Sequence, residues 1–269
     1  MSDLLSIPGL LTAFGLLALL CLAAGVGALV RTRLPEQHRS RESMQLVQLT
    51  ITLLVTFTSI VLGLLTGSVT SGFDKAYRAR GTYSAELVQM DQCLRDYGPQ
   101  TGAMRRELRA YVGAVIASTW PGEPPPKVSY PDISGMPRVG ESVELSALLD
   151  NIRTELRELL PKDAVQERIL PECLNQFSDL AKSRWEVIEG ANQSIAPPFY
   201  WVLALWLVIL FGSFGLTAPP NPLTIIVVVL TALSITIAVA VIADLDQPYG
   251  GLFGIPSTAM RNALNDMMR

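Results

Sequence analysis

The sequence predicts an all-α membrane protein with four transmembrane helices and a helical extramembrane domain. Four apolar runs are each long enough to cross a bilayer core of about 30 Å at about 1.5 Å per residue. A polar block, residues 73–194, separates the second run from the third, and its apolar residues recur at spacings of three and four, which is typical of amphipathic helices. The mean hydropathy of +0.35 and a charged content of 17%, below the roughly 25% of soluble domains, agree with this class.

The first apolar run, residues 7–30, is rich in glycine and alanine. Small residues let helices approach closely in lipid, so we expect a packed transmembrane helix. A polar link, residues 31–43, follows and carries Arg31, Arg33, Arg39 and Arg41.

The second apolar run carries a polar stripe along one face. At about 100° per residue, a set of small or polar residues falls within roughly 40° of one line. These stripe residues are Gln45, Gln48, Thr52, Thr56, Ser59, Gly63, Thr66 and Thr70. Lipid is a poor neighbour for such a face, so either another helix covers it as a packing seam or water covers it as a pore wall. The length of the stripe and the two glutamines at one end favour the pore wall.

Four amphipathic helices are expected in the polar block, over residues 83–97, 104–120, 145–159 and 163–185. The first should continue the second membrane helix and end at Tyr97-Gly98-Pro99. Asp163 is the expected N-cap of the last, in which Pro171 marks either a kink or the true start. The connecting loop, residues 121–140, contains three consecutive prolines, which serve as a connector or as a docking ligand.

The remaining apolar runs, residues 199–216 and 223–243, predict the third and fourth membrane helices, and the third begins with aromatic residues typical of a membrane interface. The chain therefore divides into residues 1–72, 73–194, 195–243 and 244–269. The last of these segments is expected to form a turn followed by an amphipathic tail.

Several function classes are disfavoured by the composition. A net charge of −3 argues against a nucleic-acid partner, and a single histidine, His38, excludes a histidine-based triad or a multi-histidine metal site within one chain. The sequence has no phosphate-binding loop, nucleophile elbow or metalloprotease motif, so we do not expect an enzyme. Cys21, Cys93 and Cys173 have no CxxC spacing.

Short motifs across residues 44–260 resemble the bestrophins and, more specifically, a bacterial bestrophin-like membrane protein family. They include residues 71–80 (SGFDKAYRAR), 89–99, 106–120, Arg184-Trp185, 194–199 and 244–250 (DLDQPYG). The resemblance implies four membrane helices, a helical extramembrane part and a homopentamer around an ion pore lined by the second helix, in a bacterial inner membrane. The bestrophin neck is bulky and apolar, whereas the stripe here contains no aromatic residue and Phe57 points away from it.

The turn after the fourth membrane helix is a second candidate site, formed by Asp244, Asp246, Pro248, Tyr249 and Gly250. We expect Asp244 or Asp246 to contact a basic residue or backbone amides and so to fix the exit of the tail. The resemblance adds a calcium alternative, because bestrophins carry an acidic calcium-binding cluster at a comparable place. Two aspartates are few for an ion that takes 6–8 oxygen ligands, and no other cofactor is expected.

Two functions remain open at this point. The first is an oligomeric ion channel, with membrane lipid, further copies of the chain and inorganic ions as partners, and with its ion selectivity undecided. The second is a membrane-anchored interaction or sensor module without conduction. The orientation is also contested, since the arginines of residues 31–43 place that link in the cytoplasm, whereas the bestrophin resemblance places the helical domain and both termini there. We expect the latter orientation, which a disulfide between Cys93 and Cys173 would contradict.

Overall fold

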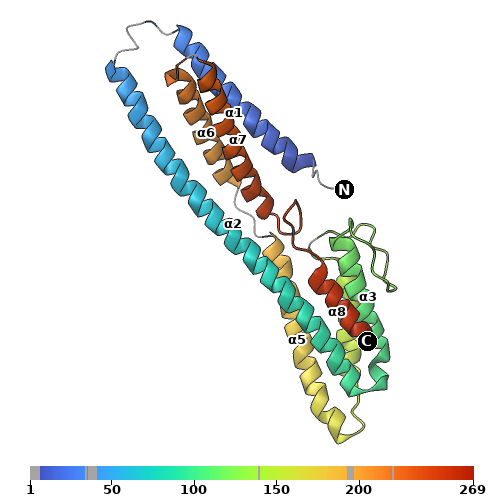
Figure 1. Cartoon of the computed structure of the whole chain (residues 1–269). Coiled ribbons are helices and arrows are strands. Elements are labelled where there is room, and N and C mark those ends of the chain that lie inside the picture. The colour runs from blue at the N-terminus through green and yellow to red at the C-terminus, as the bar shows by residue number, and fades with distance from the viewer. Residues whose placement is uncertain (1–6, 34, 36–40, 139, 193–196, 220) are drawn as a thin grey trace. The chain divides into compact units, whose positions relative to one another are not determined.

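The computed structural model describes residues 7–33, 35, 41–138, 140–192, 197–219 and 221–269, so His38 lies outside the described residues. Within these ranges the chain is helical and has no strand, which confirms the predicted fold class. Figure 1 shows the helices in order. They are α1 (Ile7–Arg33), α2 (Arg41–Tyr97), α3 (Gly102–Thr119), α4 (Val143–Glu158), α5 (Ala164–Asn192), α6 (Pro197–Thr217), α7 (Pro222–Leu245) and α8 (Thr258–Met268).

The chain forms two compact units. Unit 1 comprises residues 1–71, 194–247 and 251–253, and unit 2 comprises residues 72–193, 248–250 and 254–269. The helices α1, α2, α6 and α7 are long and apolar enough to span a membrane, as the four apolar runs predict. The tail that follows α7 contributes α8 to unit 2.

In unit 1, α1 packs against α6 and α7 (Figure 1). Glycine makes the close approach of α1 and α6 possible, because a Cβ at Gly27 would overlap the carbonyl oxygen of Gly212, and one at Gly215 would overlap that of Ala24. Close backbone contact through small residues is the usual means of association between helices in lipid. The packed helix predicted for the first apolar run is therefore present.

One continuous helix, α2, runs from unit 1 into unit 2, which confirms the predicted continuity of the second membrane helix with the first amphipathic helix. It ends where Gly98 adopts φ 128°, a conformation that residues with a side chain rarely adopt, and Pro99 opens a short 3₁₀ turn, Pro99–Thr101. The Thr101 hydroxyl donates to the carbonyl oxygens of Leu94 and Gly98, which closes the turn between α2 and α3.

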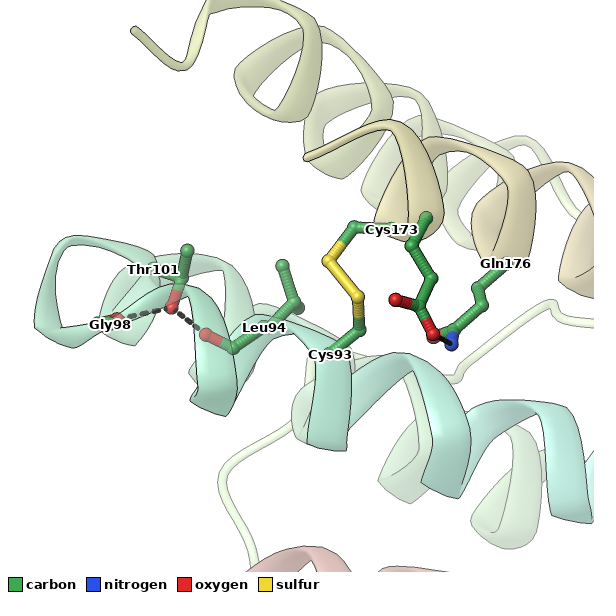
Figure 2. The surroundings of a disulfide bond; sticks show 7 residues. Cys93, Leu94, Gly98, Thr101, Cys173 and Gln176 are labelled. Atoms are coloured by element: carbon green, nitrogen blue, oxygen red, sulfur yellow. Dashed lines mark hydrogen bonds between the residues drawn. A yellow bond between two sulfur atoms is a disulfide. The ribbon is translucent and has the colours of Figure 1, made fainter. Parts of the chain in front are cut away.

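The core of unit 2 consists of apolar side chains from α2, α3, α4, α5 and α8. Cys93 on α2 and Cys173 on α5 lie within this core and form a disulfide, with a Cα–Cα distance of 5.6 Å (Figure 2). The sequence left their pairing open, since a separation of 80 residues carries no signal of its own. Cross-linking positions so far apart stabilises a fold mainly by restricting the unfolded chain.

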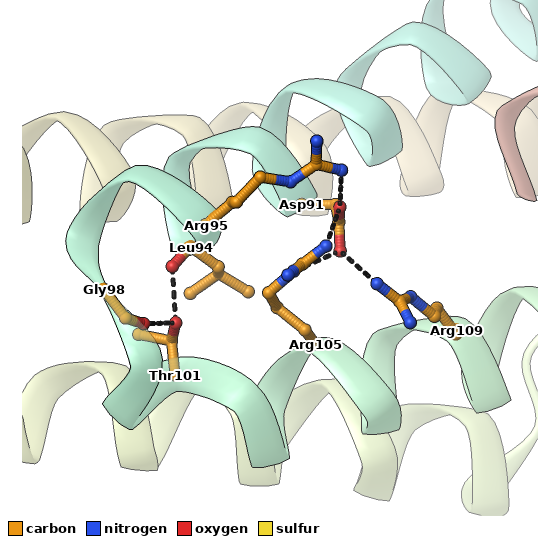
Figure 3. Close-up of polar contacts among 7 residues, drawn as sticks. All are labelled: Asp91, Leu94, Arg95, Gly98, Thr101, Arg105 and Arg109. Carbon is orange, nitrogen blue, oxygen red and sulfur yellow. Dashed lines mark hydrogen bonds and ion pairs between the residues drawn. The ribbon is translucent and has the colours of Figure 1, made fainter. Parts of the chain in front are cut away.

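A cluster of charges lies beside this core at the α2–α3 hairpin (Figure 3). The Asp91 side chain is 1% exposed and accepts two hydrogen bonds of 2.9 Å from Arg105, through Nε and Nη2. Arg95 Nη2 lies 3.3 Å from the same carboxylate and Arg109 Nη2 lies 3.9 Å from it. One buried carboxylate therefore pairs with three arginines from two helices, and it fixes the register between α2 and α3.

Side-chain caps mark where α4 and α5 begin, and the sequence predicted the second of these caps. The Ser142 hydroxyl caps α4 by accepting from the Leu145 amide, and Asp163 Oδ1 accepts from the Val165 and Gln166 amides at the start of α5, as predicted. Pro171 lies inside α5, so the alternative in which it marks the start of this helix is wrong.

The loop of residues 121–140 packs on α3. Val128 and Tyr130 lie over Gly113, where a Cβ would approach the Val128 side chain to 2.6 Å. Arg261 of α8 also holds this loop, through an ion pair of 2.9 Å with Glu123 and a hydrogen bond to the Pro124 carbonyl oxygen. The loop is thus attached to its own chain at both α3 and α8.

The Asp91 cluster predicts a selective loss of stability. Replacing Asp91 by Asn should lower the free energy of unfolding by about 2–4 kcal/mol, because the partly buried Arg105 and Arg109 and the exposed Arg95 lose their shared, buried counter-charge. The matched control is Asp150→Asn, which breaks an exposed ion pair with Arg153 and should change stability by about 0.5 kcal/mol or less. Thermal unfolding in mild detergent measures both, and equal effects would contradict the role of the cluster.

Candidate functional site

Every residue of the polar stripe on α2 is exposed in the single chain, from Gln45 at one end to Thr70 at the other. Between residues 45 and 71, the buried residues of α2 are Thr58, Leu65 and Val69. At about 100° per residue, these three lie roughly 100–140° around the helix from the line of the stripe. The face of α2 that carries Leu65 into an apolar cluster with residues of α1, α6 and α7 is therefore a different face, and within the described residues the stripe is left uncovered.

Phe57 lies roughly 140° around α2 from the line of the stripe, so it points away from the stripe, as the sequence indicates, and it is 48% exposed. Its ring centroid is 6.3 Å from that of Trp206 on α6. No aromatic residue interrupts the stripe, so its surface consists of hydroxyl groups, amides and one glycine.

The stripe hydroxyls are hydrogen-bonded along their own helix. Thr52, Thr56, Ser59 and Thr66 each donate to the carbonyl oxygen four residues earlier, at 2.9, 2.9, 2.8 and 2.7 Å. This bond satisfies the hydroxyl proton inside a membrane without a second helix. It also leaves the hydroxyl oxygen with free lone pairs on the outer face of the helix. The exposed hydroxyls between residues 52 and 66 thus present neutral hydrogen-bond acceptors, whereas the amides of Gln45 and Gln48 present both donors and acceptors.

The turn after α7 is held by Asp244. Its carboxylate accepts the backbone amide of Leu252, at 3.0 and 2.9 Å, and that of Phe253 at 2.9 Å. The expected contact between one of the two aspartates and backbone amides is therefore present. Gly251 has φ 69°, and a Cβ there would overlap the Asp244 carboxylate, so only glycine fits this turn.

The calcium alternative at Asp244 and Asp246 stays a prediction. Both carboxylate oxygens of Asp244 already accept amide protons, and Asp246 is half-buried. Among the described residues, no group of three or more histidine, cysteine, aspartate or glutamate side chains could hold a metal ion.

Tyr249, the third polar residue of the predicted turn, belongs to a cluster in unit 2. Its hydroxyl accepts from Arg80 Nε at 3.3 Å, and the Arg80 guanidinium lies 4.7 Å from the Tyr249 ring centroid and 5.1 Å from that of Trp120. Trp120 Nε1 donates to the carbonyl oxygen of Ile255 at 2.8 Å, and the Ile255 amide donates to that of Pro248 at 2.7 Å. Sequence reasoning named Arg80 and Trp120 only as parts of separate motifs, because no spacing rule brings them together.

Four membrane-spanning helices and a helical unit closed by buried polar clusters define an integral membrane protein. A family profile described as the Bestrophin-like domain matches residues 18–260, so the chain belongs to the Bestrophin-like family. No curated protein matches the sequence.

Solved structures support the same fold. A variant of a bacterial bestrophin homologue from Klebsiella pneumoniae is 16% identical over 96% of this chain and 99% of its own, with a TM-score of 0.68. A second variant of a homologue from that organism is 16% identical over 96% of each chain, with a TM-score of 0.65. A crystal structure described as a membrane protein variant is 16% identical over 95% of this chain and 97% of its own, with a TM-score of 0.64. At these identities the likeness shows the fold.

The turn predicts a specific cost for Gly251→Ala. Positive φ at a non-glycine residue costs about 1–3 kcal/mol, and the overlap with Asp244 should weaken the bonds to Leu252 and Phe253 in addition. Gly135→Ala is the matched control, because Gly135 has φ 93° and a Cβ added there would meet no other atom within 4 Å.

We expect Gly251→Ala to lower the unfolding free energy by about 1–2 kcal/mol more than the control does. A double-mutant cycle with Asp244→Ala isolates the overlap from the backbone strain. Additive effects in that cycle would show that Asp244 does not constrain residue 251.

Proposed function

We propose that the chain assembles into a homopentamer around an ion pore lined by the stripe of α2. The observation that carries this proposal is the exposed polar stripe, which lies on a face of α2 that the described residues leave uncovered. A polar surface of that length is costly against lipid, and a ring of copies turns each stripe toward a shared aqueous path. Membership of the Bestrophin-like family and the fold of bacterial bestrophin homologues support it.

We further propose that this pore favours cations. The hydroxyl protons of Thr52, Thr56, Ser59 and Thr66 are used on the helix backbone, so the oxygen lone pairs face the path. Oxygen lone pairs can replace part of the water shell of a cation, and the stripe has no lysine or arginine to attract an anion.

The second candidate function is an interaction or sensor module anchored in the membrane. It rests on the loop of residues 121–140, where Pro124 and Pro125 are exposed although the loop around them is attached to α3 and α8. The oligomeric state separates the two functions. A monomer or dimer in mild detergent leaves no central path for α2 to line and favours the module, whereas a ring of about five chains favours the channel.

We propose that unit 2 lies on the oxidising side of the membrane. A disulfide between Cys93 and Cys173 persists in the periplasm or outside the cell and is rare in the cytoplasm. The arginines of residues 31–43 then lie in the cytoplasm, in agreement with the positive-inside rule. This is the reverse of the orientation that the bestrophin resemblance implies.

The pore proposal predicts the effect of a bulky residue on the stripe. Thr56→Trp should reduce single-channel current in planar bilayers to a small fraction of the parent value, because the indole fills the aqueous path. Leu64→Trp is the control, since Leu64 is 69% exposed on α2 but lies roughly 120° from the line of the stripe. Currents from Thr56→Trp that match both the parent and the control would exclude α2 as the pore wall.

The reversal potential in a sodium chloride gradient tests the cation preference.

The orientation proposal predicts which side of the membrane is labelled by an impermeant thiol reagent. In a chain lacking Cys93 and Cys173, a cysteine introduced as Glu155→Cys on α4 should react in cells whose outer membrane is permeabilised and whose inner membrane is intact. A cysteine introduced as Pro35→Cys should react only after the membrane is opened. Both positions are exposed, so accessibility within the fold does not separate them. The opposite labelling pattern would place unit 2 in the cytoplasm.

A further inference from the structure

Unit 2 contains a cavity of about 40 Å³ between α2, α3, α5 and the loop of residues 121–140. Three arginines line it, Arg80, Arg138 and Arg184, and its lining includes no aspartate or glutamate. Arg80 is 3% exposed and Arg184 is 8% exposed, so two of these charges are buried. Buried guanidinium groups are normally paired with carboxylates.

Neither buried arginine has an acidic partner among the described residues. Arg80 donates through Nε to the Tyr249 hydroxyl and stacks on the Trp120 and Tyr249 rings, which leaves its two Nη groups without a protein acceptor in that part of the chain. Arg184 donates through Nη2 to the Ser146 hydroxyl at 2.9 Å, and that hydroxyl lies 3.4 Å from Glu141 Oε1. The positive charge at the cavity is therefore not balanced by a directly bound carboxylate of the described chain.

Hydroxyl groups add further donors to the cavity wall. Tyr83 and Tyr111 are hydrogen-bonded to each other through their hydroxyl groups. Only one of the two hydroxyl protons is used in this bond, so the other hydroxyl can donate its proton to a ligand. Burial raises the pKa of Tyr111 above its ordinary value, so this hydroxyl is protonated at neutral pH. Thr119 is 6% exposed, and its hydroxyl has no partner among the described side chains and carbonyls.

We propose that this cavity binds a small monovalent anion of halide or nitrate size. The guanidinium groups of Arg80 and Arg184 supply the charge, and the tyrosine pair and Thr119 supply hydroxyl donors. About 40 Å³ has room for two or three water molecules or one such ion, and larger anions such as gluconate do not fit. The site belongs to unit 2 and shares no residue with the stripe of α2, and it does not rest on the proposed channel activity.

The test uses the purified full-length protein in detergent at constant ionic strength, with sodium gluconate replaced stepwise by sodium chloride, bromide or nitrate. We expect the thermal unfolding midpoint to rise with the small anions and to saturate, by about 2–5 °C at ten times the dissociation constant. A crystal grown in bromide should show anomalous density between Arg80 and Arg184. Equal midpoints in gluconate and in all three small anions, or the absence of bromide at the cavity, would overturn the proposal.

Substitutions distinguish a site from a general salt effect. Arg184→Gln should raise the half-saturating chloride concentration about tenfold or more, because a charge-assisted donor is lost. Arg157→Gln, on the exposed face of α4, should leave it unchanged. Tyr111→Phe removes one hydroxyl without changing a charge, and it should weaken chloride binding severalfold. If Arg184→Gln and Tyr111→Phe fold and respond to chloride as Arg157→Gln does, the cavity is not the anion site.

Discussion

The continuity of α2 is the constraint on which both units depend. The same helix must satisfy lipid over its first part and the core of unit 2 over its last part, without a break in its backbone hydrogen bonds. In unit 1 the hydroxyls of Thr52 and Thr56 bond to carbonyl oxygens of their own helix, which satisfies the hydroxyl protons but leaves the polar face exposed. In unit 2 the same helix carries Leu87, Met90 and Leu94 into a dense core. A single helix therefore contributes a membrane-spanning segment to unit 1 and core side chains to unit 2.

The helices could be predicted from the sequence because their causes are local. Apolar length identifies the membrane helices, spacing identifies the amphipathic ones, and Asp163 and Gly98 identify where helices begin and end. The position of Pro171 within its helix was ambiguous, because proline can occupy either the start of a helix or an interior position with a local distortion. In the structure Pro171 lies in the interior of α5. The stripe was likewise predictable, because its residues share one helix and one period.

The buried clusters could not be predicted in this way, because their members come from separate helices. Arg80, Trp120 and Tyr249 meet only after α2, α3 and the turn after α7 have packed. Cys93 and Cys173 are likewise joined by tertiary structure rather than by spacing. The Asp91 cluster did leave a signal, since Arg95 follows Asp91 by four residues and Arg105 precedes Arg109 by four, which places each pair on one helix face. That signal gains meaning only when the α2–α3 hairpin is known.

The disulfide also changes the covalent topology of unit 2. Cys93 and Cys173 close a ring of main chain that contains α3, α4 and the loop of residues 121–140. A peptide bond broken anywhere in that loop opens the ring, but the disulfide still joins the two resulting pieces of the polypeptide. A protein nicked there would migrate as one chain under non-reducing conditions and as two fragments after reduction. A cut in this loop would thus leave the two halves of unit 2 covalently joined.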